Sequence, residues 1–368
     1  MKEYWTYRKF EDCLEKVKYT SKISTSDYLT EGEYPIVSQE EGLIAGFWNN
    51  EADVFRTNKP VVIFGDHTRV LKYVDFDFVL GADGVKILQP IDDLSAKFFL
   101  YYLKWYNIPS LGYSRHYKLL KEIKIPIPPL STQSRIVSEL DLLQSIIDKQ
   151  KAQVKELDNL AQAIFYDMFG DPVENEKGWE VKKLGEIGKI VTGNTPSRQI
   201  KEYYDTPFIE WIKSDNLSNN YIYASKAKEF LSKSGSSKGR IIPTGSILVT
   251  CIAGSLSSIG TASMINRTVS FNQQINAIIP NEKLVSNLFV LHTIRRMGKR
   301  IQDNATNGMK HIITKSVFKN IPIILPPLSL QQTFAAKIES IEKQKAAISK
   351  SLAETQRLFD YTMDKYFG

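Results

Sequence analysis

The chain repeats one segment of its sequence at a distance of 198 residues, and this repeat constrains the fold more than any other feature. The phrase Pro-Pro-Leu-Ser-x-Gln begins at Pro128 and again at Pro326, and a Phe-Gly pair closes each copy, at residues 169–170 and 367–368. An Ile-Pro-Ile phrase precedes both copies, and two extra residues separate it from the Pro-Pro pair in the second copy. A repeat of this length indicates two copies of one structural unit.

A heptad pattern of apolar residues follows each Pro-Pro-Leu-Ser-x-Gln phrase. Within residues 136–168 the apolar stripe recurs at alternating spacings of four and three, with Gln150 as its polar member. Residues 334–366 keep the same frame with more polar members. The pattern predicts two long helices that pair with each other, the alternative being that each helix packs on a separate globular core. Ser131 and Ser329 are the expected N-caps of these helices.

Several apolar residues lie outside this heptad stripe, namely Leu142, Ile146, Leu160, Phe165, Leu358 and Met363. They have two possible uses. They either cover the adjacent globular segments or form a surface on which helices of a partner protein dock.

The repeat divides the chain into four parts, residues 1–129, 130–170, 171–327 and 328–368. The first and third parts contain short β-branched or aromatic runs separated by Gly, Asn and Asp, such as residues 60–65 and 245–250, with helix expected near 94–106 and 284–302. We therefore predict an α+β fold with two β-rich domains joined by two long helices in a coiled coil. A pseudo-two-fold axis relating the repeats requires these helices to be antiparallel.

The composition places the chain among folded proteins with a mildly basic charge. The net charge is +7, hydrophobic residues make up 42% and charged residues 24%. The two cysteines exclude a disulfide framework, and no apolar run reaches the roughly 18 residues of a membrane span. We therefore expect a cytoplasmic protein with no membrane partner, and the basic charge permits nucleic acid as a partner.

The sequence lacks the motifs of enzymes that act on DNA. There is no GxxxxGK[ST] phosphate loop, no GxGxxG, no Asn/Asp-Pro-Pro-aromatic tetrapeptide of an amino-methyltransferase and no Pro-Asp of a metal-dependent nuclease. The four histidines have no metal-ligand spacing to one another or to a cysteine. We therefore predict a protein that binds its target without transforming it, with no catalytic residue, metal or cofactor of its own.

Polar loops that combine glycines with basic residues are the candidate nucleic-acid contacts, because Arg, Lys, Asn, Gln, Ser and Thr read base edges or hold phosphates. In the first globular part they are Ser38, Gln39, His67, Thr68, Arg69, Tyr113, Ser114, Arg115, His116 and Lys118. In the second they are Asn194, Thr195, Ser197, Arg198, Lys213, Ser214, Lys238, Arg240, Ser255, Lys310 and His311. The last loop of each part, with Arg115-His116 or Lys310-His311, is the strongest candidate.

The basic charge is concentrated in the second globular part. Residues 1–130 hold 17 basic and 18 acidic residues, whereas residues 171–328 hold 21 basic and 12 acidic residues, a net charge of +9. The long-range attraction for a polyanion therefore comes from the second part.

The order of these phrases resembles that of type I restriction–modification specificity (S) subunits. The resemblance rests on residues 179–187, on Thr192-Gly193-Asn194-Thr195-Pro196, on Phe271-Asn272-Gln273-Gln274-Ile275 and on the repeated Pro-Pro-Leu-Ser-x-Gln, and it covers essentially the whole chain. It implies that residues 1–129 and 171–327 are target recognition domains and that 130–170 and 328–368 are conserved helical regions. The first domain lacks the Gly-Asn-Thr-Pro phrase, which indicates a different recognition-domain subtype.

The resemblance also implies a function. An S subunit recognises a bipartite double-stranded DNA sequence and directs partner subunits without catalysing a reaction. The implied partners are two methyltransferase (M) subunits docked on the helices, and restriction (R) subunits bound through the M subunits. S-adenosylmethionine, ATP and magnesium would then belong to the partners.

A different class of function fits the same repeat. Two β-rich ligand-binding modules on a coiled-coil spacer are also the layout of a scaffold that does not bind DNA. For a DNA reader the helices have a suitable length, since about 37 residues span roughly 55 Å and two major-groove half-sites lie about 34–36 Å apart. We therefore expect the helices to set the spacing between the two parts of the target.

Overall fold

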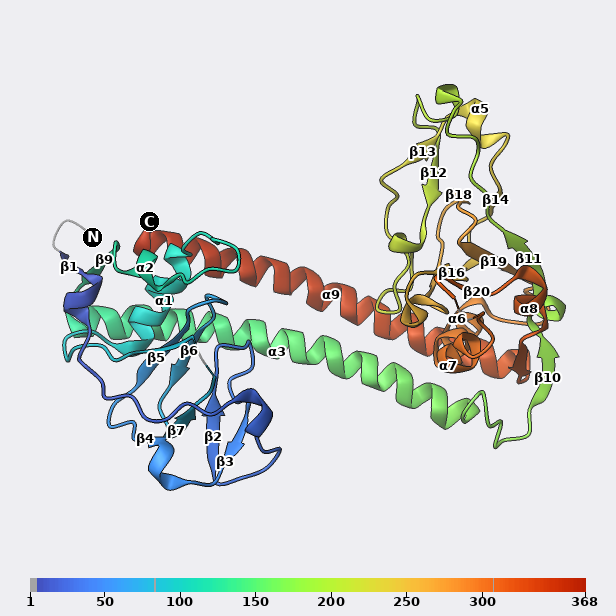
Figure 1. The fold of residues 1–368 in the computed structure, drawn as a ribbon. Helices are drawn as coiled ribbons and strands as arrows, with labels where there is room; N and C mark the ends of the chain where they lie inside the picture. The colour runs from blue at the N-terminus through green and yellow to red at the C-terminus, as the bar shows by residue number, and fades with distance from the viewer. Residues whose placement is uncertain (1–4, 83, 307) are drawn as a thin grey trace. The chain divides into compact units, whose positions relative to one another are not determined.

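The computed structural model describes residues 5–82, 84–306 and 308–368, which form two compact units (Figure 1). Unit 1 comprises the described residues up to Ala152 together with Ser349–Gly368, and unit 2 comprises Gln153–Ile348. Both units mix strands with helices, and each contains part of both long helices, α3 (Leu130–Phe169) and α9 (Leu328–Phe367). These features confirm the expected α+β class.

Unit 1 contains short strands in two sheets and one separate pair. The pair joins β1 (Thr6–Lys9) to β9 (Lys124–Ile127) in antiparallel register. One sheet has the order β3-β2-β7-β4, from β3 (Gly46–Trp48), β2 (Tyr34–Val37), β7 (Phe78–Leu80) and β4 (Val54–Phe55). The other has the order β6-β5-β8, from β6 (Leu71–Val74), β5 (Val61–Gly65) and β8 (Val85–Leu88). Within the first sheet β2 and β7 run parallel, so that their carboxyl ends meet.

The helices of unit 1 join its sheets to the long helices. They are α1 (Ala96–Tyr106), α2 (Tyr117–Leu120) and the 3₁₀ turns Phe10–Cys13, Thr25–Asp27 and Glu51–Asp53. The aromatic face of α1 packs on the end of α9, where the rings of Phe98 and Phe367 lie 5.4 Å apart and those of Tyr102 and Phe367 lie 5.6 Å apart. Burying these large rings anchors the last turns of α9 in the core of unit 1.

Unit 2 repeats this strand arrangement with longer loops. Its separate pair joins β10 (Glu180–Lys183) to β21 (Pro322–Leu325). One sheet has the order β13-β12-β18-β14, from β13 (Phe230–Leu231), β12 (Ile209–Ile212), β18 (Val269–Phe271) and β14 (Ile241–Ile242). The other has the order β11-β19-β15-β17, from β11 (Gly188–Thr192), β19 (Ile275–Pro280), β15 (Ile247–Thr250) and β17 (Ala262–Met264). A short pair joins β16 (Ile252–Ala253) to β20 (His311–Ile312). The strands β12 and β18 are parallel, as β2 and β7 are in unit 1.

The helices of unit 2 pack around an aromatic core. They are α4 (Leu184–Ile187), α5 (Lys233–Ser236), α6 (Asn287–Arg296), α7 (Gly298–Gln302), α8 (Lys315–Asn320) and the 3₁₀ turns Lys201–Tyr203, Ser214–Asn216 and Leu256–Ser258. Phe165 and Phe169 of α3, Phe289 of α6 and Phe334 of α9 are fully buried against one another, with ring centroids 4.9–6.2 Å apart. The β-rich fold of unit 2 and its part of the helix pair therefore share one core.

In each unit the segments of α3 and α9 run side by side in opposite directions (Figure 1, green and red). In unit 1 Tyr366 donates to Glu139 at 2.5 Å and Gln150 donates to Ser351 at 2.9 Å. In unit 2 Lys345 donates to Asp158 at 2.6 Å. The heptad residues Ile136, Leu140, Ile338 and Ile341 are buried along this contact. The predicted antiparallel pairing is thereby confirmed.

The apolar residues outside the heptad stripe divide between the two uses considered above. Phe165 and Met363 are buried in the cores of units 2 and 1, so they cover the globular parts. Leu142, Leu160 and Leu358 remain 62%, 47% and 51% exposed, and Ile146 is 36% exposed. Within the described residues none of these four, here called the exposed helix face, packs against the hydrophobic core of its unit.

The glutamine of the repeated phrase ties each long helix to the rest of its unit. In unit 1 the buried Gln133 side chain accepts from the Ser95 N–H at 2.8 Å and donates to the carbonyls of Asp93 and Pro128. In unit 2 the buried Gln331 side chain accepts from the Ser286 N–H at 2.9 Å and donates to the carbonyls of Leu284 and Pro326. Ser95 and Ser286 precede α1 and α6, so the same joint recurs in both units.

One local prediction is wrong. Ser131 and Ser329 are not N-caps, since α3 and α9 begin one residue earlier, at Leu130 and Leu328. The carbonyl of Pro129 already accepts from the N–H groups of Thr132 and Gln133, so the first turn is closed ahead of the serine.

The two extra residues after the second Ile-Pro-Ile phrase do not form a structural insertion. Lys9 pairs with Lys124, and Lys183 pairs with Pro322. Lys124 and Pro322 are 198 residues apart, so the structural repeat keeps this offset through both strands. The second Ile-Pro-Ile phrase therefore starts two residues earlier in its strand than the first.

Candidate nucleic-acid interface

The parallel strands in each unit place two predicted loops at one sheet edge. Beyond β2 and β7, the N–H of Gly81 donates to the carbonyl of Val37 at 2.9 Å, directly before Ser38 and Gln39. Beyond β12 and β18, the N–H of Asn272 donates to the carbonyl of Ile212 at 3.0 Å, directly before Lys213 and Ser214. Ser38-Gln39 and Lys213-Ser214 therefore occupy corresponding positions.

A second set of corresponding backbone hydrogen bonds gathers the other loops. In unit 1 the N–H of Asp66 donates to Gly84 at 2.7 Å, and the N–H of His116 donates to the carbonyl of Asp66 at 2.8 Å. In unit 2 the N–H of Cys251 donates to Gln274 at 2.8 Å, and the N–H of Ile313 donates to the carbonyl of Cys251 at 2.8 Å. Each unit thus holds loops from three distant parts of its sequence together through main-chain bonds.

Gln39 connects the loops of unit 1. Its side-chain oxygen accepts from the His67 N–H at 3.3 Å, and its carbonyl accepts from the hydroxyl of Thr68 at 2.6 Å. Gly84, with φ +95°, packs against this side chain, and a Cβ there would lie 2.7 Å from the Gln39 Oε1 atom. The positive φ favours glycine at this position, and the missing side chain leaves room for Gln39.

Tyr113 and His67 form a stacked pair at the surface of unit 1. Their ring centroids lie 5.5 Å apart with an interplanar angle of 19°, and Tyr113 is 96% exposed. Arg69 has a positive φ of 63° and donates to the carbonyl of Ile108 at 2.9 Å, which ties its turn to the loop before Tyr113. The exposed face of Tyr113 is thus open to a ligand.

Two predicted contacts in unit 1 are buried and hold the loops in place. The Leu111 N–H donates to Nε2 of His116, so Nδ1 carries the proton and donates to the carbonyl of Asp66 at 2.9 Å. Ser38 is 3% exposed, and its carbonyl accepts from the buried Lys72 ammonium at 2.8 Å. Burial lowers the pKa of Lys72. By contrast, Ser114 is half-buried, and Arg115 and Lys118 are exposed.

Asn194 connects the loops of unit 2. Its side chain donates to the carbonyl of Lys238 at 2.7 Å and accepts from the N–H of Arg240 at 2.8 Å. Lys238 and Arg240 are both exposed. The preceding Gly193 is needed for packing, because a Cβ there would lie 2.1 Å from the carbonyl oxygen of Asn272. The neighbouring Thr195 hydroxyl donates to the side chain of Gln273.

Arg198 and Lys213 share one carboxylate. Glu229 accepts from Arg198 at 2.5 Å and from Lys213, and Trp211 lies beside both cations, 4.8 Å and 5.1 Å from its ring centroid. The hydrogen bond from Lys213, together with that from Arg198, holds the pKa of Glu229 below its usual range despite partial burial. The carboxylate therefore stays ionised between the two cations.

The remaining candidates of unit 2 lie on neighbouring loops. The hydroxyl of Ser214 donates to Gln274 at 3.3 Å, and the carbonyl of Gln274 accepts from the N–H groups of residues 251 and 252. Ala253 of β16 pairs with His311 of β20, which places Ser255 and Lys310 on the segments adjoining this strand pair. Ser197 is exposed beside Arg198. Main-chain and side-chain bonds thus connect the predicted loops within each unit.

The similarity between Arg115-His116 and Lys310-His311 does not extend to the structure. His116 is the N-cap residue of α2, whereas Thr314 holds that position before α8. His311 therefore precedes the counterpart of His116, which is Ile313 by the main-chain bonds and Thr314 by the helix cap. The two basic-histidine pairs are therefore similar in sequence but do not occupy equivalent positions in the two units.

Sequence reasoning missed Trp211, Glu229, Gln273, Gln274 and Lys72, all of which contact predicted site residues. The Phe271-Asn272-Gln273-Gln274-Ile275 phrase was a usable signal for two of them. The other three lie in strands or far along the sequence, where nothing marks them as neighbours of the loops.

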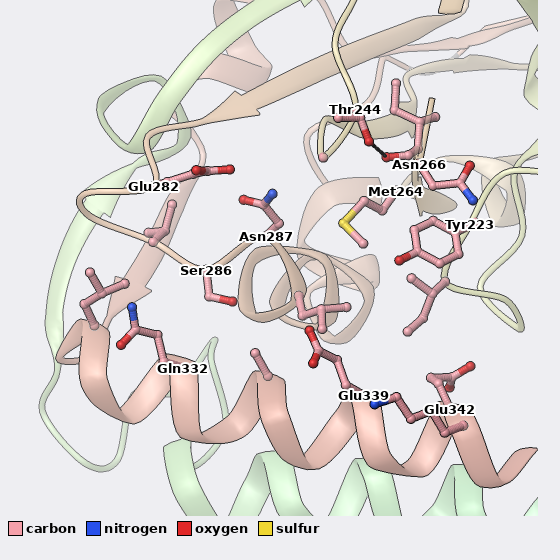
Figure 2. Close-up of a pocket in the computed structure, with 18 of the residues that line it drawn as sticks. Tyr223, Thr244, Met264, Asn266, Glu282, Ser286, Asn287, Gln332, Glu339 and Glu342 are labelled. Atoms are coloured by element: carbon pink, nitrogen blue, oxygen red, sulfur yellow. Dashed lines mark hydrogen bonds between the residues drawn. The ribbon is translucent and has the colours of Figure 1, made fainter. Parts of the chain in front are cut away.

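Unit 2 also contains a cavity of about 680 Å³ between the start of α6 and α9 (Figure 2). Figure 2 shows Ser286 and Asn287 on one side of the cavity and Gln332, Glu339 and Glu342 on the helix below it. Glu282, Glu339 and Glu342 outnumber the single Lys343 in the lining, so this charge disfavours a phosphate backbone. The cavity is therefore not part of the candidate DNA interface.

Two further features are absent from the part of the chain that the structure describes. Within 5–82, 84–306 and 308–368, no group of three or more His, Cys, Asp or Glu residues is arranged to hold a metal ion. In the same ranges no helix combines the length and apolar character needed to cross a membrane.

Known proteins share both the sequence and the fold of this chain. The family model described as type I restriction modification DNA specificity domain matches residues 2–158 and 176–356. The type I restriction enzyme EcoR124I/EcoR124II specificity subunit of Escherichia coli is 26% identical over 94% of this chain and 89% of its own length. The HindI specificity subunit of Haemophilus influenzae is 34% identical over 50% of this chain and 39% of its own length.

A solved structure extends the similarity to the fold. The type I restriction–modification S subunit from M. genitalium superposes with a TM-score of 0.63 and 16% identity, over 99% of this chain and 96% of that one. Two matches to the family model, one to each half of the repeat, cover most of the sequence. The chain therefore belongs to the type I restriction–modification specificity subunits, non-catalytic proteins whose matched domain recognises DNA sequence.

Proposed function

We propose that this chain recognises a DNA target in two parts, each read by the loops gathered in one unit, and that it brings partner enzymes to that target. The observation that carries the proposal is the set of corresponding main-chain bonds that holds polar and basic loops together in both units. Two copies of one loop framework on one chain suit two separate stretches of sequence. The four-part division at residues 129, 170 and 327 follows from the same repeat.

The residues proposed to contact DNA are the exposed or half-buried members of the predicted set. In unit 1 they are Gln39, His67, Thr68, Arg69, Tyr113, Ser114, Arg115 and Lys118. In unit 2 they are Asn194, Thr195, Ser197, Arg198, Lys213, Ser214, Lys238, Arg240, Ser255, Lys310 and His311. Ser38 and His116 are buried, so we assign them a positioning role in place of direct contact.

Partner subunits supply the chemistry in this proposal. Methyltransferase (M) subunits dock on the exposed helix face, one for each copy of the repeat, and a restriction (R) subunit joins through them. S-adenosylmethionine, ATP and magnesium bind to these partners. The exposed leucines of α3 and α9 support the docking surface, because several large apolar side chains that stay exposed along a helix are typical of a protein interface.

The experiment that tests the function is methylation mapping. The chain is expressed with its M subunit in cells that lack other methyltransferases, and modified sites are located by sequencing genomic DNA. The expected result is one motif with two specified parts around an unspecified spacer of fixed length. A continuous motif would contradict the two-part target, and the absence of methylation with a soluble complex present would favour a scaffold that does not bind DNA.

A further inference from the structure

Arg198 is held more firmly than the other exposed basic residues of the unit 2 loops. Its guanidinium lies 4.4 Å from the ring centroid of Tyr204 and 4.8 Å from that of Trp211, and the two rings meet edge to face. Tyr204 donates to the carbonyl of Pro196 at 2.7 Å, and Trp211 donates to the carbonyl of Asn194 at 3.2 Å. Both rings are therefore fixed to the loop that carries Arg198.

The guanidinium nevertheless stays available for a ligand. The Arg198 side chain is 51% exposed, and within the described part of the chain it donates one hydrogen bond, to Glu229. A guanidinium carries five N–H donors in a fixed plane. Donors of defined orientation thus remain unused at the surface of the basic unit.

The charge around Arg198 distinguishes a base from a phosphate as its ligand. Glu229 lies between Arg198 and Lys213, so the three groups together carry one positive charge. The carboxylate cancels one of the two positive charges, so a phosphate is attracted less strongly here than to a pair of cations without a carboxylate. The O6 and N7 atoms of guanine are neutral acceptors that match two parallel guanidinium donors, and a nearby carboxylate accepts from the N4 amino group of cytosine.

Rigidity leads to the same assignment. A phosphate contact tolerates a flexible side chain, since it needs charge near the backbone more than a fixed plane. A stacked guanidinium loses little conformational freedom on binding and presents its donors in one plane, as bidentate contact with a base edge requires.

We propose that Arg198 reads a guanine in the major groove of the target part that unit 2 contacts, and that Tyr204, Trp211 and Glu229 position it. This inference rests on the proposed function, DNA recognition by unit 2. It goes further by fixing one base pair of that part as G·C.

The test is methylation mapping with variants of Arg198 in the complex with the M subunit, using genomic DNA as the probe. The wild-type motif is expected to contain a fixed G·C pair in one part. In Arg198→Ala and Arg198→Lys the motif becomes degenerate at that single position. The preference for G·C over the other base pairs there falls roughly tenfold to a hundredfold. Lysine keeps the charge but not the paired donors, so its failure to restore specificity separates base reading from electrostatics.

Lys201→Ala is the matched control, because it removes an exposed positive charge three residues away and leaves the Tyr204, Trp211 and Glu229 contacts in place. Co-purification with the M subunit and an unchanged second part of the motif establish that each variant is folded. An unchanged motif in both Arg198 variants overturns the proposal. Uniformly weaker methylation at an unchanged motif also overturns it, because that result marks a phosphate contact. A wild-type motif without a fixed G·C pair in either part overturns it as well. A wild-type chain that methylates no motif contradicts the proposed function itself.

Discussion

At the level of single residues, the buried glutamines Gln133 and Gln331 do more for the fold than their polar character suggests. Each is fully buried and satisfies one N–H and two carbonyl groups that would otherwise lack partners. The unmet groups would each cost free energy, since a buried polar group without a partner loses its hydration. The repeated phrase thus keeps its glutamine for a structural reason.

Gln331→Ala is expected to destabilise the protein by about 3 kcal/mol, because it removes three hydrogen bonds, of which one is buried and two are partly buried. Urea unfolding followed by circular dichroism measures this loss. Gln332→Ala is the control, since Gln332 is adjacent and exposed, and a change within about 0.5 kcal/mol is expected for it. Equal effects of the two substitutions would contradict the assigned role of Gln331.

The ion pair of Glu210 with Arg267 predicts a pH-dependent stability for unit 2. Arg267 donates to the two carboxylate oxygens at 2.6 Å and 2.8 Å, and this interaction, with a hydrogen bond from the Ala227 N–H, lowers the pKa of Glu210 from its ordinary 4.5. A carboxyl whose folded pKa is lowered stabilises the fold above its unfolded pKa. That stabilisation is lost as the pH falls through the folded value.

Glu210→Gln is therefore expected to cost about 2 kcal/mol at pH 7 and progressively less below pH 4.5. Urea unfolding of both proteins at pH 7, 5, 4 and 3 gives the comparison. A difference that stays constant across this range would show that the charge of Glu210 does not contribute.

At the level of secondary-structure elements, the long helices carry two kinds of apolar residue, and the sequence distinguished them only in part. The heptad spacing identified the buried stripe, and the shared frame predicted the pairing of α3 with α9. The outer residues were ambiguous, because Phe165 and Leu160 look alike in sequence although one is fully buried and the other is 47% exposed. Tertiary packing determines which of the two side chains is buried, and the helical spacing of apolar residues does not contain this information.

The exposed helix face predicts a specific defect in assembly. Leu142→Ser combined with Leu358→Ser is expected to reduce the co-purified M subunit at least tenfold, since two exposed anchors of the proposed interface are lost. The melting temperature of the isolated chain should stay within about 2 °C, because neither side chain is part of a core.

Val181→Ser serves as the control, since Val181 is 52% exposed on β10 and lies outside the helices. Normal assembly of the double variant would rule out this face as the docking surface. Loss of assembly in the Val181 variant would point to a general loss of solubility.

The loops illustrate the limit of sequence reasoning at this scale. Short polar segments next to glycines were selected correctly as surface loops in most cases, but hydrogen bonding between distant segments was not visible. His116 was chosen for its chemistry and turned out to be buried, because its ring fills the space between Asp66 and Leu111. Glu229 was overlooked because its role depends on two cations 31 and 16 residues away.

At the level of the whole molecule, the charge separates the two recognition regions. The net charge of +9 over residues 171–328, against −1 over residues 1–130, predicts that phosphate contacts are more numerous in the second region. Lys238→Ala and Arg240→Ala should each lower the slope of log affinity against log salt by about 1. Arg115→Ala and Lys118→Ala should lower it less in the same fluorescence anisotropy titration, and equal effects would contradict the uneven distribution.

The helix pair predicts the length of the target. Inserting four residues after Val154 in α3 and four after Ala347 in α9, between the Gln150–Ser351 and Asp158–Lys345 contacts, lengthens each helix by about 6 Å, or roughly two base pairs. Methylation mapping should then report a longer spacer between unchanged half-motifs. An unaltered spacer in a folded, active complex would show that the helices do not set the spacing.

The assignment of Ser349–Gly368 to unit 1 has a consequence for how the chain is made. Trp105 donates to Asp364, which is synthesised 259 residues later. Phe98 and Tyr102 likewise pack on Phe367, which is made near the end of the chain. At 5–20 residues per second, the ribosome needs on the order of 10 to 50 seconds to synthesise the residues of α9 that pack on α1. During this interval unit 2 is synthesised while the aromatic face of α1 stays exposed to solvent. A chaperone that binds this face is therefore expected to raise the yield of folded protein.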